Sequence, residues 1–167
     1  MISYTWADEN NTVIASTDGR HIPADPRNPD YADLLRLGIA PSPYVAPAPT
    51  AVDVTAERDR RLRVFPFGGK MYDFCDGRGS DINVAGAGTL ALAAIIAGAQ
   101  PGDLRWAFPE TDFVWIAADN SSTAMDAQTC LAFAQSAAGW KARHIRAARV
   151  LKDTSPIPAD YANDARW

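Results

Sequence analysis

The chain has 167 residues, of which 47% are hydrophobic, and its formal net charge is −4. This hydrophobic content supports a folded core and argues against global disorder, and the length suits one ordinary domain or two small ones. A weakly acidic chain argues against nucleic-acid binding, because phosphate contacts need a dense basic surface. Both ends are acidic whereas residues 55–152 are slightly basic, so the ends could be attracted to a basic surface on this chain or on a neighbour.

Signals for export, membrane insertion and metal binding are weak. The N-terminus lacks a basic and then apolar leader, so we expect no signal peptide, and the apolar run Leu90–Ala97 is too short to span a bilayer. Cys75 and Cys130 fit no zinc spacing, and only His21 and His144 could assist them. We therefore expect two reduced thiols, with a disulfide between them as the alternative, no metal and no cofactor.

Residues 1–40 are predicted to form a small docking module. Alternating apolar residues before the turn at Asp8 and again in 12–16 predict a two-stranded hairpin, and Asp18-Gly19 is typical of a further tight turn. Asn28-Pro29 favours the start of a helix that ends at Gly38. A hairpin of this size is not stable alone. We expect the aromatic and apolar side chains of the module to contact a partner, namely Trp6, Tyr31 and Leu34.

Residues 41–54 are predicted to be a Pro-rich linker. The four prolines at positions 41, 43, 47 and 49 disfavour helix and interior strand and favour an extended conformation. The segment is either a plain spacer or a strap on a partner surface, in which case Tyr44 and Val45 are the contact residues.

Residues 55–153 are predicted to form a compact C-terminal domain of three helices and two short antiparallel strand pairs, which makes the fold class α+β. Its first helix is expected to begin after a cap at Thr55 and to end at Arg63. A hairpin over 64–74 follows, with Gly68-Gly69 supplying the positive φ of its turn. The second helix is predicted over 82–97, where Gly86 and Gly88 weaken it and indicate close approach of another backbone.

The second strand pair is predicted from two aromatic segments, 104–108 and 112–118, joined by a turn, with a short return strand at 123–125. The tryptophans of these segments, Trp106 and Trp115, are expected to lie in the core. An aromatic ligand slot is the alternative.

The last helix is predicted to begin after Asp126, with Met125 and Cys130 as a hydrophobic staple. An apolar seam then recurs at alternating steps of three and four residues through Cys130, Phe133, Ala137, Trp140, His144, Ala147 and Leu151. The seam is either the face buried in its own domain or a surface for self-association. The tail 154–167 has little periodicity, and we expect it to be mobile unless neighbouring subunits hold it, with Trp167 as a contact residue.

Groups arranged for catalysis are absent from the sequence pattern. There is no Gly-x-Ser-x-Gly elbow and no His-Glu-x-x-His. The glycine pairs at 77–79 and 86–88 lack the Gly-Lys-Ser/Thr ending of a phosphate loop, and Glu110 and Asp112 flank a turn where acids are usually solvated. We expect no enzyme activity and no catalytic residues.

The block 55–153 resembles a domain-of-unknown-function family found at the C-termini of phage and prophage tail fibre proteins. The matching segments are 55–62, 65–70, 90–98, 112–120 and 125–129, including Phe65-Pro66-Phe67-Gly68-Gly69-Lys70. Residues 4–38 are similar to the short module that precedes this domain in small tail proteins. The resemblance implies a virion setting and carries no catalytic residues across.

Together these features predict a structural component of a phage tail tip or tail fibre that binds the tail hub or central fibre. We expect a homo-oligomer in the virion, with a trimer favoured, and neither nucleic-acid binding nor membrane insertion. Two alternatives remain open: a fibre-assembly chaperone, and a receptor- or glycan-binding module that uses Trp106 or Trp115 with Asp112.

Overall fold

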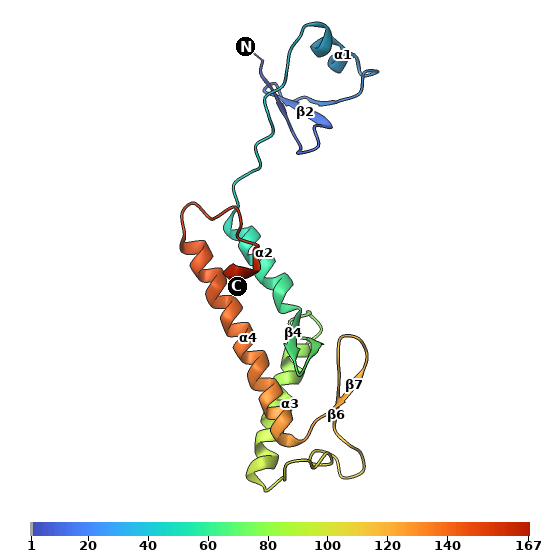
Figure 1. The fold of residues 1–167 in the computed structure, drawn as a ribbon, viewed down its shortest axis with the longest axis vertical. Helices are drawn as coiled ribbons and strands as arrows, with labels where there is room; N and C mark the ends of the chain where they lie inside the picture. Colours follow the sequence, from blue (N-terminus) through green and yellow to red (C-terminus); the bar gives the residue numbers. More distant parts are fainter. Residues whose placement is uncertain (1) are drawn as a thin grey trace. The chain divides into compact units, whose positions relative to one another are not determined.

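A computed structural model describes residues 2–167 and divides the chain into two compact units, one ending at Ala48 and one beginning at Pro49 (Figure 1). The described residues contain four α-helices and three small antiparallel sheets. The predicted α+β class is therefore confirmed.

The first unit is a three-stranded sheet with one helix. The strands are β1 (Tyr4–Trp6), β2 (Val13–Ser16) and β3 (His21–Pro23), in the order β1-β2-β3. Only the β1–β2 hairpin was predicted. β3 pairs with β2 and sets Ile22 opposite Ile14, and both side chains are buried. The third strand thus supplies the apolar partner that a two-stranded hairpin lacks.

The helix of the first unit, α1 (Pro29–Arg36), begins where the sequence predicted. The Asn28 side chain accepts hydrogen bonds from the backbone N–H groups of Asp30 and Tyr31, and Gly38 follows the helix with a φ of 66°. Beyond it, the Pro-rich segment is anchored to β1, because the N–H of Trp6 donates to the carbonyl of Ser42 and the N–H of Ser42 donates to that of Tyr4. The start of the strap is held within its own unit.

The second unit contains three helices and two hairpins. In chain order these are α2 (Ala51–Leu62), β4 (Val64–Phe67), β5 (Lys70–Asp73), α3 (Ser80–Ile96), β6 (Val114–Ile116), β7 (Ser122–Ala124) and α4 (Ala127–Asp153), followed by a 3-10 turn, η1 (Asp164–Arg166). The number of helices and strand pairs agrees with the prediction, whereas several boundaries differ.

The first helix of this unit begins earlier than predicted. Its cap is Thr50, whose hydroxyl accepts from the N–H of Asp53 while the Asp53 carboxylate accepts from the N–H of Thr50. This reciprocal capping box satisfies free donors at the helix start. Thr55 lies inside the helix and its hydroxyl donates to the Ala51 carbonyl. The prediction of a Thr55 cap was wrong because the Thr-x-x-Asp pattern at 50–53 is the stronger start signal.

The second strand pair has different partners from those predicted. β6 pairs with β7 in the register Trp115 to Thr123, whereas residues 104–108 form turns. The Trp106 indole N–H donates to the Met125 carbonyl, and the Leu104 carbonyl accepts from the N–H of Phe113. These isolated bonds hold residues 104–108 in place without forming a ladder.

The helices α3 and α4 lie side by side and carry the main core between them and the β4–β5 hairpin (Figure 1). Phe133 of α4 is fully buried, with ring centroids of Phe65, Tyr72 and Trp115 within 5.1 Å of its own. A Cβ added to Gly88 would lie 2.4 Å from that of Ala134. The predicted close approach is thus confirmed at Gly88, whereas nothing lies within 4 Å of a Cβ at Gly86.

The seam of α4 is buried within its own unit. Cys130, Phe133 and Ala137 belong to the main core, and His144 and Leu151 are also buried. Asp126 caps the helix through the N–H of Thr129, as predicted. Both cysteines are free thiols, with Cys130 buried.

The tail 154–167 packs on its own chain. Ile157, Tyr161 and Trp167 contact a second apolar cluster of Val54, Ala148 and Leu151. Arg61 of α2 donates to the Ala162 carbonyl and pairs with Asp164 at 2.8 Å. The expectation that only neighbouring subunits hold this segment was wrong, because the sequence alone did not reveal that α2 and α4 offer it an apolar cleft with a matching cation.

Candidate interaction surfaces

Three of the residues predicted to contact a partner meet at one pocket of the first unit. Trp6, Tyr31 and Leu34 line a pocket of about 390 Å³ together with Leu35 of the same helix. Leu34 is 4% exposed and belongs to the core with Ile14 and Ile22. The helix α1 and the strand β1 thus form an apolar depression whose floor includes Leu34 and whose walls include the two aromatic rings.

A second depression on the same unit brings Trp6 next to Tyr44. It has a volume of about 380 Å³ and is also lined by Pro41 and Pro43. The Ser42 bridge to β1 positions this part of the Pro-rich segment. Val45 lies just beyond it with 81% of its surface exposed. Trp6 is therefore shared by both depressions, and four of the predicted residues gather around it or beside it.

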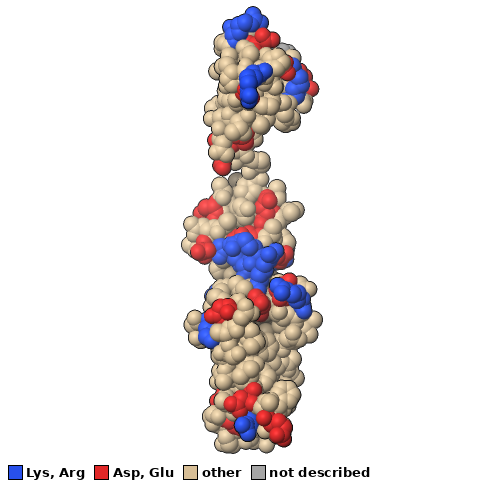
Figure 2. All heavy atoms as spheres, turned by 90° about the vertical axis from the view of Figure 1, so that its right-hand side faces the viewer, with Lys and Arg blue, Asp and Glu red and all other residues tan. Residues whose placement is uncertain are grey.

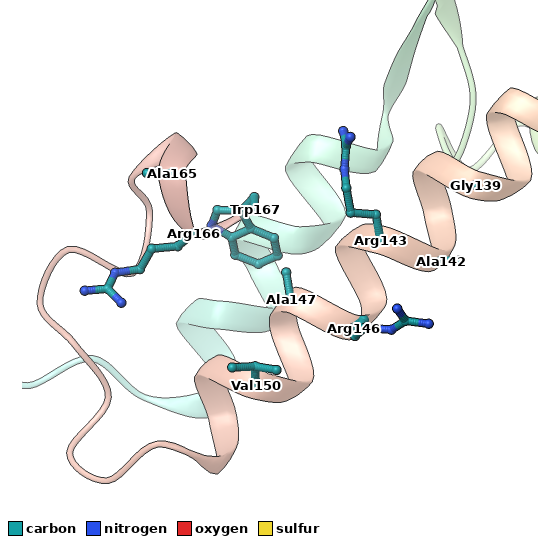
Figure 3. Close-up of a pocket in the computed structure, with 9 residues that line it drawn as sticks. All are labelled: Gly139, Ala142, Arg143, Arg146, Ala147, Val150, Ala165, Arg166 and Trp167. Atoms are coloured by element: carbon teal, nitrogen blue, oxygen red, sulfur yellow. The ribbon is translucent and has the colours of Figure 1, made fainter.

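The sixth predicted residue, Trp167, lies in the second unit and forms one wall of a groove along α4 (Figure 3). The groove has a volume of about 540 Å³. Its floor is made of small or apolar residues of α4, and its rim carries three arginines. The lining residues are Gly139, Ala142, Arg143, Arg146, Ala147, Val150, Ala165, Arg166 and Trp167.

Contacts within the chain hold the Trp167 ring. Its indole N–H donates to the Tyr161 carbonyl at 2.8 Å, and the Arg61 guanidinium lies 5.2 Å from the ring centroid. The ring also stacks on His144 at 6.0 Å. A tail residue fixed by a hydrogen bond, a cation–π contact and a stacked ring is part of the fold as well as part of the groove wall.

His144 lies beneath this wall and is 2% exposed. Burial lowers the pKa of the imidazole, and the charges of Arg143 and Arg61 act in the same direction. The Nδ1 atom lies 2.8 Å from the Trp140 carbonyl, and this hydrogen bond opposes the lowering of the pKa. The site therefore favours a neutral ring that packs between Trp140 and Trp167.

The rim of the groove carries positive charge. Arg166 pairs with Asp160 at 2.7 Å, and Arg143 lies 4.5 Å over the Trp140 ring. Neither Arg143 nor Arg146 has a carboxylate within ion-pair distance among residues 2–167. Figure 2 shows one face of the second unit, with a cluster of Lys and Arg in the upper half of the unit and an area with few charged side chains lower down.

Most of the helix α3 is uncharged. No charged residue occurs from Ile82 to Ala99. One side of α3 packs on α4 and the core through Val84, Gly88 and Ala91. The other side, here called the outer α3 face, is exposed and consists of Ile82, Ala85, Gly86, Thr89, Leu92, Ala93 and Ile96.

The outer α3 face is unusual for a surface helix. Ile82 is 72% exposed and Ile96 is 79% exposed. A surface helix of a globular protein normally sets polar residues opposite its apolar stripe, and a helix that is apolar all round is normally buried. The sequence already contained this signal in its uncharged run of residues. That run was interpreted only as a possible membrane span, for which it is too short.

The tryptophans weighed as ligand-binding residues lie against the core. Trp106 packs on Phe113 with ring centroids 4.7 Å apart, and Trp115 packs on Phe133. Asp112 pairs with Arg105 at 3.1 Å. These contacts support the core interpretation of the two aromatic segments over a ligand slot.

Many acidic side chains of residues 2–167 form surface ion pairs or helix caps, such as Asp164 with Arg61 and Asp126 at the start of α4. Burial raises the pKa of the Cys130 thiol to about 11, and burial also raises that of Cys75. Neither thiol is activated as a nucleophile.

Among residues 2–167 no three His, Cys, Asp or Glu side chains converge as metal ligands, and no helix is long and apolar enough to cross a membrane.

Comparison with known families places the chain. Residues 45–165 match the family described as a domain of unknown function, DUF4376. The match covers most of the chain and includes the tail as well as the end of the Pro-rich segment, so the chain belongs to this family. It extends further on both sides than the block that carried the resemblance. No curated protein and no solved structure matches the chain.

Proposed function

We propose that this protein is a structural component of the tail tip or tail fibre of a phage or phage-like particle. In this role it binds the tail hub or central fibre and other subunits, as a homo-oligomer in the virion. Membership of the DUF4376 family supports the proposal together with the tail-fibre resemblance of its sequence motifs.

The observation that carries the proposal is the amount of apolar surface left uncovered on both units. The first unit exposes Leu35 and Ile39 at 58% and 38%, and both line the pocket of Trp6 and Tyr31. The second unit exposes the outer α3 face. Large exposed apolar patches mark protein–protein contacts, and buried aromatic anchors tend to dominate the energy of such contacts.

The pocket of the first unit is assigned to the tail hub or central fibre. Its walls are aromatic and its floor is apolar, which suits insertion of an apolar side chain from a partner. Tyr44 and Val45 of the strap lie at or beyond the adjacent depression. They would extend the contact along the partner surface.

The first test asks whether the chain belongs to the finished particle. Particles are purified through a density gradient from cells that express an epitope-tagged copy, and the chain is quantified by mass spectrometry against a major tail protein. We expect a fixed stoichiometric ratio in intact particles. Presence in assembly intermediates but not in finished particles would favour the assembly chaperone instead, and absence from both would contradict the proposal.

A matched pair of variants tests the assigned pocket. Leu35 lines the pocket and Leu37 does not, although their exposed fractions are similar. We expect Leu35→Glu to reduce incorporation into particles at least about tenfold, because it places a charge in an apolar contact. Leu37→Glu should leave incorporation unchanged. Equal incorporation of both variants would rule out this pocket as the docking site.

A further inference from the structure

The exposed residues of the outer α3 face recur at the spacing of a helix–helix contact. Ile82, Thr89 and Ile96 are seven residues apart, with Ala85 and Leu92 between them. Steps of three and four residues place all five in one stripe along the helix. A partner that follows this stripe over its whole length is another helix.

The absence of charge on the outer α3 face restricts the composition of the partner helix further. A charged side chain set against it would be desolvated without a counter-ion, which is costly. The partner helix must therefore be uncharged over about 21 Å, the rise from Ile82 to Ile96 at 1.5 Å per residue. The outward sides of α2 and α4 carry charged residues such as Arg60 and Arg146. The outer face of α3 in a second copy of the chain meets the requirement.

We propose that two copies of this protein associate through their outer α3 faces, with the helices antiparallel about a two-fold axis at Thr89. In this arrangement Ile82 of one copy lies opposite Ile96 of the other. Leu92 lies opposite Gly86, so that a large residue faces a glycine, and Ala85 lies opposite Ala93. Thr89 faces its own counterpart, as a two-fold contact requires.

A groove beside α3 supports the antiparallel direction. It lies between α3 and α4 and has a volume of about 350 Å³. Its lining is mainly apolar, including Ile82, Ala85 and Ala138, and also contains the ion pair of Asp81 and Lys141. It is therefore at the N-terminal end of α3. Ile96, the most exposed apolar residue of the helix, is at the other end. Antiparallel packing inserts Ile96 of each copy into the groove of the other, whereas parallel packing sets Ile96 against Ile96.

Gly86 fits the same contact. A Cβ at Gly86 would meet nothing within this chain, whereas Gly88 is needed for packing on Ala134. A glycine in a helix interior weakens the helix, and the single chain offers no compensation for it at position 86. Close approach of a second helix backbone would provide that compensation.

The apolar area that the contact buries limits the strength of the association. Ile82, Leu92 and Ile96 are 72%, 46% and 79% exposed, which amounts to roughly 240 Å² of apolar surface per copy at about 120 Å² for a whole aliphatic side chain. The pair buries roughly twice that, before the groove and the small residues are counted. Stable interfaces bury about 1,200–2,000 Å² in total. We therefore expect a reversible dimer in the micromolar to millimolar range.

Sedimentation equilibrium of the purified full chain over this concentration range tests the contact. The wild type is expected to shift from monomer to dimer. Thr89→Glu and Thr89→Lys should each weaken dimerisation at least about tenfold, because identical charges meet at the axis. An equal mixture of the two variants should recover the dimer through the opposite charges. A chain that stays monomeric throughout, or Thr89 variants that dimerise like the wild type, would overturn the proposal.

Two leucines of α3 provide a matched control. Leu90 and Leu92 are both 46% exposed, but only Leu92 lies on the stripe. Leu92→Glu is expected to weaken dimerisation at least about tenfold, whereas Leu90→Glu should change it less than twofold. Far-ultraviolet circular dichroism should be unchanged in both variants. Equal effects of the two substitutions would mean that non-specific apolar association, and not the stripe, holds the copies together.

Cysteine crosslinking determines the direction of the helices. Ile82→Cys and Ile96→Cys are prepared separately in a Cys75→Ser background, mixed and oxidised. The antiparallel contact predicts a disulfide between the two variants and little disulfide within either one, read by mass spectrometry. Predominant 82-to-82 or 96-to-96 disulfides would overturn the antiparallel arrangement.

These experiments use the purified chain alone and do not depend on its proposed function. A monomeric chain that is nevertheless present in particles would contradict only the self-association. A dimer that is absent from particles would contradict only the tail location. The outer α3 face could instead bind the exposed apolar side of α1 from another copy. In that case Leu37→Glu would abolish the dimer, and this result would overturn the proposal.

Discussion

The helices α3 and α4 share one core, but their outward sides differ. α4 turns arginines such as Arg143, Arg146 and Arg149 outward, and its buried seam contains most of its large apolar residues, with Ile145 and Val150 exposed. α3 carries an apolar inner side and an equally apolar outer face. Packing within one chain thus accounts for most of the sequence of α4. The sequence of α3 is accounted for only if a second surface covers it.

The largest expected effect is on the inner side of α4. Phe133→Ala should lower the free energy of unfolding by about 3–5 kcal/mol, because it removes a buried ring and leaves a cavity among Phe65, Tyr72 and Trp115. Urea denaturation followed by tryptophan fluorescence measures the change. Val150→Ala on the same helix, at a position 62% exposed, is the control and should stay within about 0.5 kcal/mol of the wild type. Similar losses in both variants would refute the division of α4 into a buried and a solvent side.

The next effect compares the two sides of α3 directly. Gly88→Ala places a Cβ against Ala134 and should destabilise the chain by about 1–3 kcal/mol through overpacking. Gly86→Ala meets no atom of the chain and should stabilise the dilute monomer by up to about 1 kcal/mol through helix propensity. Urea denaturation at low concentration measures both. Opposite signs would confirm that α3 has one packed and one open side, and a loss of stability in Gly86→Ala would contradict it.

The smallest expected effect concerns pH at the C-terminal half of α4. Because the pKa of His144 is lowered on folding, the unfolded chain binds the proton more readily. The free energy of unfolding should therefore fall as the pH drops below the ordinary histidine value of 6.5. Trp167→Ala opens the ring to water, so it should raise the pKa of His144 and reduce this pH dependence.

NMR titration of the imidazole checks the change in pKa, with His21→Gln in the background so that a single histidine signal remains. Denaturation at several pH values between about 5 and 7 checks the change in stability. An unchanged pKa in Trp167→Ala would mean that the tail does not shield His144 in solution.

Local patterns predicted the well-defined ends of elements. Asn28 and Asp126 cap the helices that follow them, and Gly68-Gly69 turns the β4–β5 hairpin. These features depend on residues a few positions apart, which a sequence displays directly. The cap at Thr50 was not predicted although its Thr-x-x-Asp pattern is also local, because Thr50 directly follows Pro49 and Thr55 is a second residue of a capping type.

Long-range packing could not be predicted in the same way. The pairing of β6 with β7, the place of Trp167 on His144 and the ion pair between Arg61 and Asp164 all join residues whose proximity depends on the whole fold. Of the six expected contact residues, Trp6, Tyr31 and Leu34 do meet at one pocket. Their common face follows from α1 packing on the sheet through Ile14 and Ile22.

The two thiols differ in burial, so their rates of alkylation report two different opening motions of the chain. Cys130 is buried in the main core, whereas Cys75 is half-buried near the start of α3. An alkylating reagent reaches a thiol only when the surrounding structure opens. Labelling at Cys75 therefore times local fluctuations, and labelling at Cys130 times disruption of the whole core, so one mass-spectrometric time course separates the two kinds of motion without any added probe.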